Sequence, residues 1–245
     1  DFNYNENATF DQEGAEQGIQ VDSLFNVTYP DLVFNIQSER TQPPRGTFGL
    51  PSNVTIRYHH GLMAPVNDAL DELINEYIKI PGGWGTLEGA PLNIKRIIAN
   101  THMSINPVYP TDFTQGFYNG EADLVTLNEE NIIRQEFGSN CTFLGLNQAI
   151  VPRAFSSVTG AVYLQQGYSK IMYAIEQANL LPLLKRRNKD YMFFVESDAN
   201  TATDSSLIYD STTERFAAFQ IADEQGGGFT RFPLTVNDLR VLLLS

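Results

Sequence analysis

Few residues of this 245-residue sequence could bind a metal ion or act as a nucleophile. There are three histidines, His59, His60 and His102, and one cysteine, Cys141. Neighbouring residues of a strand point to opposite sides, so His59 and His60 are poorly placed to bind one metal ion. We therefore expect no metal site and no cofactor. His102 follows a predicted helix, and we expect it to stabilise the fold first and to belong to a partner surface second.

Acidic residues gather in two places, but neither place has the pattern of a catalytic or calcium site. The segment 198–204 would need Gly at the sixth position and Glu at the twelfth position of a calcium loop, where Thr203 and Tyr209 stand. Glu129 and Glu130 are adjacent, and their spacing assigns no acid and base roles. Nucleophile-elbow, phosphate-loop and dinucleotide motifs are absent. We interpret the chain as non-enzymatic.

Trp84 is the one tryptophan, and glycines flank it. It could be a platform on which a sugar stacks, or it could anchor the loop after the first helix, and the anchor is the preferred interpretation. Exposure of Trp84 on one surface with Tyr109, Phe117 and Tyr118 would favour sugar binding. Burial of these rings would count against it.

A capped helix at residues 67–78 is the strongest local pattern. Pro65 keeps Ala64 out of the helical region, so the chain arrives extended. Asn67 is a good N-cap, and Pro81–Gly83 ends the helix. Helical spacing places Leu70, Leu73, Ile74, Tyr77 and Ile78 on one apolar face.

Periodicity and turn residues predict the remaining elements. We expect loop with short strands over 107–120, and either a helix start or a turn at 128–130. One expected helix is capped by Asn93 and buries Ile94, Ile97 and Ile98, and the other expected helices are 168–175, 180–184 and 239–244. The expected strands are 32–36, 54–58, 122–127, 142–151 and 191–195, with a bulge at Gly145 in the fourth of them. Residues 207–210 and 215–219 are expected to form a hairpin.

Charge and hydropathy exclude two classes of partner. The formal net charge of −13 argues against nucleic acid, because phosphate binding requires a basic surface. No apolar stretch approaches the ~18 residues of a membrane span. We expect no direct membrane span in this segment.

Three motifs together resemble the fasciclin-like domain family. The stretch 62–70, with Ala64, Pro65 and Asn67, is similar to the first signature of that family. The stretch 140–152, with Asn140, Asn147 and Pro152, is similar to the second signature. Between them, residues 97–102 resemble the family helix that ends in histidine. The resemblance implies an α+β fold, a β-sandwich or wedge with flanking helices.

A divergent second copy of the first signature stands at 192–200, and residues 239–245 resemble 95–101. We therefore expect an N-terminal extension or the end of a preceding region at 1–53, one fairly complete domain at 54–160, and the N-terminal half of a second domain at 161–245. A half domain would leave apolar surface and strand edges without partners.

The resemblance implies an extracellular, non-enzymatic interaction module that acts in cell adhesion or in an outer-membrane surface assembly. Both copies are most similar to long surface lipoproteins of the Bacteroidota, anchored through a region outside this sequence. The expected partners are other surface proteins or the missing continuation of the chain. The alternative is a glycan-binding accessory protein of a polysaccharide-uptake system.

Overall fold

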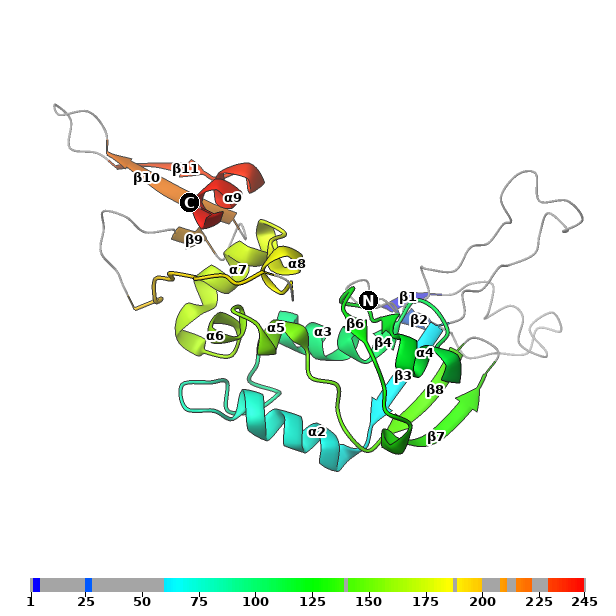
Figure 1. Cartoon of the computed structure of the whole chain (residues 1–245). Coiled ribbons are helices and arrows are strands. Elements are labelled where there is room, and N and C mark those ends of the chain that lie inside the picture. Colours follow the sequence, from blue (N-terminus) through cyan, green and yellow to red (C-terminus); the bar gives the residue numbers. More distant parts are fainter. Residues whose placement is uncertain are drawn as a thin grey trace, which may run out of the picture. The chain divides into compact units, whose positions relative to one another are not determined.

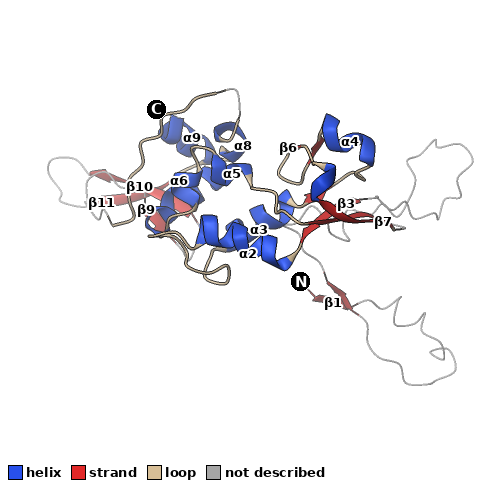
Figure 2. Ribbon diagram, turned by 60° about the horizontal axis from the view of Figure 1, so that its bottom comes forward, coloured by secondary structure: helices blue, strands red, loops and turns tan. Residues whose placement is uncertain are grey.

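The computed structural model describes residues 2–4, 25–27, 60–138, 141–186, 189–199, 208–210, 215–221 and 229–244. Helices and open sheets are mixed along the chain (Figures 1 and 2), which confirms the expected α+β class. The predicted strands 32–36 and 54–58 lie outside the described residues.

The chain forms two compact units, and each unit combines two separate stretches of the sequence. One unit is Asp1–Val66 with Ile98–Ile150, and the other is Asn67–Ile97 with Val151–Ser245. The expected domains 1–53, 54–160 and 161–245 were defined by a sequence repeat, and they stay a prediction.

The first unit is built on a four-stranded sheet in the order β4-β3-β8-β7. Strands β3 and β8 run parallel, with His60 opposite Cys141 and Pro65 opposite Leu146. The core on this sheet contains Met63, Val108, Phe113, Val125, Leu127, Leu144 and Leu146. The strands are β3 (His60–Pro65), β4 (Met103–Ser104), β7 (Ile132–Phe137) and β8 (Cys141–Leu146), and a separate pair is formed by β1 (Phe2–Tyr4) and β2 (Phe25–Val27).

The β-bulge expected at Gly145 of β8 occurs on the neighbouring strand β7. Ile132 pairs with Leu146 and Arg134 pairs with Gly145, so Ile133 is the extra residue on β7. A Cβ atom at Gly145 would lie 3.0 Å from the Cβ of Arg134. Gly145 therefore leaves room for a bulge that lies opposite it. The strand itself ends at Leu146, earlier than expected.

Residues 107–120 contain a helix that the sequence analysis missed. Helix α4 (Pro110–Gln115) starts with proline, and the Asp112 carboxylate accepts a hydrogen bond from the Tyr109 amide at 2.8 Å. Strand β5 (Phe117–Tyr118) then pairs with β6 (Leu124–Val125). The expected strand 122–127 is reduced to β6. The predicted helix start or turn at 128–130 is a single 3-10 turn, η4 (Glu129–Asn131), between the strands β6 and β7.

The second unit begins with the predicted capped helix. Helix α2 (Asn67–Leu73) starts at Asn67 and continues as the π-helical turn η3 (Ile74–Ile78). Leu73, Ile74 and Ile78 are buried, as the apolar face predicted. The next helix, α3 (Leu92–Thr101), contains the unit boundary between residues 97 and 98.

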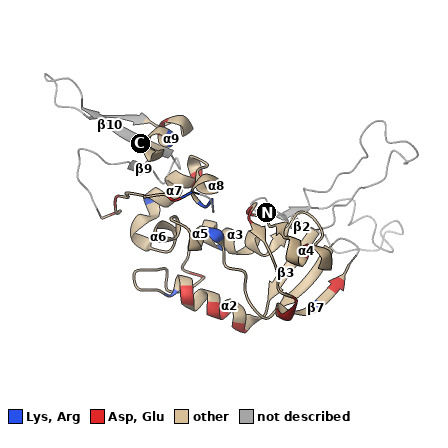
Figure 3. Ribbon diagram, in the orientation of Figure 1, with Lys and Arg blue, Asp and Glu red and all other residues tan. Residues whose placement is uncertain are grey.

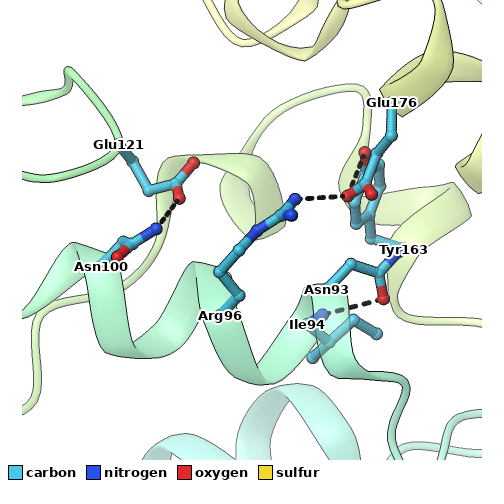
Figure 4. Close-up of polar contacts among 7 residues, drawn as sticks. All are labelled: Asn93, Ile94, Arg96, Asn100, Glu121, Tyr163 and Glu176. Atoms are coloured by element: carbon cyan, nitrogen blue, oxygen red, sulfur yellow. Dashed lines mark hydrogen bonds and ion pairs between the residues drawn. The ribbon is translucent and has the colours of Figure 1, made fainter. Parts of the chain in front are cut away.

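Helices dominate the rest of the second unit, and two of them are tied to α3. Arg96 forms an ion pair with Glu176 at 3.3 Å, and the same carboxylate accepts a hydrogen bond from the Tyr163 hydroxyl at 3.4 Å (Figure 4). The predicted helix pair, hairpin and last helix are confirmed. The elements are α5 (Arg153–Ser156), α6 (Gly160–Tyr163), η5 (Gln166–Tyr168), α7 (Ser169–Gln177), α8 (Leu181–Leu184), β9 (Ile208–Asp210), β10 (Arg215–Ile221), β11 (Phe229–Pro233) and α9 (Val236–Leu244).

The tight connection between α5 and α6 makes Gly160 a sensitive position. A Cβ atom there would overlap the Phe155 carbonyl, which is backbone and cannot swing away. We expect Gly160→Ala to lower the free energy of unfolding by about 2 kcal/mol. Gly167→Ala is the matched control, because no atom lies within 4 Å of its added Cβ, and it should change stability by less than about 0.5 kcal/mol. Urea denaturation of both variants checks this, and equal stabilities would contradict it.

Candidate functional site

His102 lies directly after α3, and its ring bonds to two backbone groups. Nδ1 lies 2.8 Å from the Ile98 carbonyl oxygen, and Nε2 lies 3.0 Å from the Ile150 amide nitrogen. The side chain is 6% exposed. It therefore satisfies a carbonyl of the last helical turn and the amide of a distant segment at once.

These contacts fix the protonation state of the ring. The Ile150 amide can only donate, so Nε2 must accept and Nδ1 must carry the proton that is donated to Ile98. Burial lowers the pKa of His102 below its ordinary value of 6.5, although the Ile98 carbonyl partly opposes this shift. The ring is neutral near pH 7 and acts as a structural bridge.

Parts of all three fasciclin-like motifs meet at this histidine within the first unit. The Met63 amide donates to the His102 carbonyl at 2.8 Å, and the Val66 amide donates to the Leu146 carbonyl at 2.8 Å. Ala64 and Pro65 pair with Gly145 and Leu146 in the parallel ladder. Of the other signature residues, Asn67 starts α2, Asn147 is exposed, Pro152 is buried before α5, and Asn140 lies outside the described residues.

The four aromatic candidates do not all belong to one unit. Trp84 is in the second unit, half-buried, and its Nε1 donates to the Tyr163 carbonyl at 2.8 Å. This contact fits the anchoring interpretation of Trp84.

The other three aromatic candidates are in the first unit. Tyr109 stacks on Phe137 with ring centroids 5.9 Å apart, and both side chains are exposed. Tyr118 is exposed, whereas Phe117 packs against the core. Their part in ligand binding stays a prediction.

The segment 191–197 differs from its predicted structure. A strand was expected at 191–195, but these residues join none of the described sheets, so that prediction is wrong. Exposure still alternates along the segment: Met192 is 83% exposed and Phe194 is 86% exposed, whereas Tyr191, Phe193 and Val195 are half-buried. This period of two is typical of an extended chain with one face on the protein, and Figure 1 shows the segment as an extended trace after α8.

Both ends of this segment are tied to helices of the second unit. The Tyr191 hydroxyl donates to the Leu183 carbonyl at 3.1 Å. At the other end, the Asp198 carboxylate accepts from the amides of Ser169 and Lys170, at 2.8 and 3.1 Å. Asp198 thus caps α7, which precedes it by 29 residues, and no local sequence pattern could show this.

The described residues include His, Cys, Asp and Glu side chains, which are common metal ligands. Among them, no three His, Cys, Asp or Glu side chains are grouped so that they could hold a metal ion. Cys141 is a free, half-buried thiol of β8. In the same described part of the chain, no helix has both the length and the apolar character needed to cross a membrane.

The two hydrogen bonds of His102 lead to a pH test. Because its pKa is lower in the folded state than in the unfolded state, His102 contributes stability that is complete above about pH 6.5 and is lost as the pH falls below that value. We expect His102→Gln to be less stable than the original chain by about 1–3 kcal/mol at pH 7.5. This difference should shrink as the pH falls toward 5, measured by urea denaturation across the range. A constant difference would contradict the neutral-ring assignment.

A scan against protein-family models gives no match. No curated protein matches the sequence, and no solved structure matches the fold.

Proposed function

We propose that the chain is a non-enzymatic extracellular interaction module of fasciclin-like type. It acts in cell-surface adhesion or as a component of an outer-membrane surface assembly. Its partners are other surface proteins or a continuation of its own chain. The observation that carries the proposal is the exposed apolar segment at Met192–Phe194.

The architecture of the first unit supports the family part of this proposal. Three segments that resemble fasciclin-like signatures were chosen from sequence alone, and parts of all three meet through β3, β8 and His102. Segments that share a family pattern by chance have no physical reason to share one hydrogen-bonded junction. This junction stabilises the fold, so we place the interaction surface elsewhere on the protein.

The second unit supports the interaction part. In the first unit, β8 covers one edge of β3 as a parallel strand. Residues 191–195 occupy the corresponding place in the second sequence copy, and no described strand pairs with them. An extended segment with two large exposed side chains is suited to receive a strand from a partner, since main-chain bonds supply affinity and pockets for alternate side chains supply specificity.

Removal of the exposed apolar side chains should abolish the association and leave the fold intact. Met192→Asp with Phe194→Asp introduces charge where a partner strand would pack, and both side chains are already exposed. We expect the tagged double variant, produced in the native source and isolated gently, to lose the proteins that co-purify with the original chain.

The matched control for this experiment is Ile105→Asp with Ile133→Asp, which alters exposed apolar residues of the first unit. It should keep the same partners. Recovery of the original chain as a lone monomer, or equal loss of partners in both double variants, would overturn the proposal.

A glycan-binding accessory protein is the second candidate. The exposed pair Tyr109 and Phe137 favours it, together with Tyr118, because sugars stack on open aromatic faces. On a glycan array we expect any neutral-glycan signal to fall at least tenfold in Tyr109→Ala. Trp84→Phe should keep the signal, because the indole anchors a loop. An array without signal would remove this candidate.

A further inference from the structure

A basic cavity lies in the second unit, at the start of the extended segment that begins with Tyr191. Its volume is about 500 Å³. One side is formed by α5 and the residues that follow it, and the other by the end of α8 and the chain after it. The lining residues are Arg153, Ser156, Ser157, Val158, Leu184, Lys185, Arg186, Lys189, Asp190 and Tyr191.

The cavity is lined mainly by basic residues, although the protein as a whole is acidic. The sequence has 29 acidic and 16 basic residues, yet four basic residues and one acidic residue line the cavity. In the ribbon of Figure 3, positions of Lys and Arg are coloured blue on α5 and on the chain beside α8. Arg153 is 32 positions before Lys185. The fold therefore brings Arg153 next to three cations that lie close together in the sequence, Lys185, Arg186 and Lys189.

The available hydrogen-bonding groups favour an anion. Arg186 and Lys189 are exposed, and no acidic side chain among the described residues forms an ion pair with them. Ser156 has a long contact of 3.5 Å to the Arg153 carbonyl, so its hydroxyl can turn toward a ligand. The Tyr191 hydroxyl is engaged with Leu183, so its ring is the part available to the cavity. Guanidinium and ammonium groups bind oxyanions through charge-assisted hydrogen bonds.

We propose that this cavity binds a small hydroxylated molecule that carries a sulfate, phosphate or carboxylate group. The volume is in the range of sites for whole small molecules and is larger than a bare ion needs. The oxyanion lies among Arg153, Arg186 and Lys189, and the hydroxylated part lies against Ser156 and Tyr191. This site shares Tyr191 with the extended segment 191–198, whereas Met192 and Phe194, which make the proposed protein contact, do not line it.

The test is direct binding to the full chain, by calorimetry at low ionic strength. The probes are glucose 6-sulfate, glucose 6-phosphate and glucuronate, with glucose and sodium sulfate as references. We expect at least one charged sugar to bind saturably with a dissociation constant below about 10 mM. The charged sugar that binds best identifies the oxyanion.

Two double variants decide whether the cavity is the site. Arg186→Gln with Lys189→Gln removes two cations from the rim, and Lys79→Gln with Lys95→Gln removes two cations elsewhere in the same unit. We expect the rim variant to bind about tenfold more weakly or worse, with the control unchanged. The proposal is overturned by no saturable binding, by equal loss in both variants, by sulfate ion binding as tightly as the sugars, or by glucose binding as well as the charged forms.

Discussion

The two hydrogen bonds of the His102 ring are the constraint on which the first unit depends. They join the last turn of α3 to the segment after β8, while the His102 carbonyl receives the Met63 amide of β3. His102 therefore connects three segments of the chain, two through its neutral, buried imidazole and the third through its backbone carbonyl. A charged ring would turn a second donor toward the Ile150 amide, so the junction requires the neutral form. This requirement explains the structural role of the His102 ring at the end of α3.

Strand β3 of the first unit is paired on both edges, whereas an extended segment of the second unit is exposed. The parallel pairing of β3 with β8 leaves β3 no free edge, because β4 covers its other side. In the second copy that the fasciclin-like resemblance implies, residues 191–195 correspond to β3, and no described strand covers them. The contrast between a paired segment and an exposed one, within a single chain, is the physical basis for placing the interaction surface at Met192 and Phe194. The basic cavity is a second candidate site, in which the fold brings Arg153 next to Lys185, Arg186 and Lys189.

Local patterns predicted the α+β class and the helices α2, α3, α7, α8 and α9, but they did not predict α4, α5 or α6. Asn67 marks the start of α2, and the isoleucines of α3 are buried, because both depend on short-range spacing. The strand predicted at 191–195 failed because a ladder needs a partner that periodicity cannot supply. The helix α4 was missed although Pro110 and Asp112 form a helix-start pattern within an aromatic-rich stretch. The hydrogen bonds of His102 to Ile150 and of Asp198 to α7 join distant residues, so they required the fold itself.

The anchored ends of the segment 191–198 have a kinetic and entropic consequence. Tyr191 holds one end on α8, and Asp198 holds the other on the first turn of α7. A free loop would have to lose backbone freedom, at roughly 1–2 kcal/mol for each residue, before a partner strand could lie along it. A segment already stretched between two tethers has lost much of that freedom during folding. Association with such a preorganised template is faster and stronger than the same contacts on a slack loop would allow.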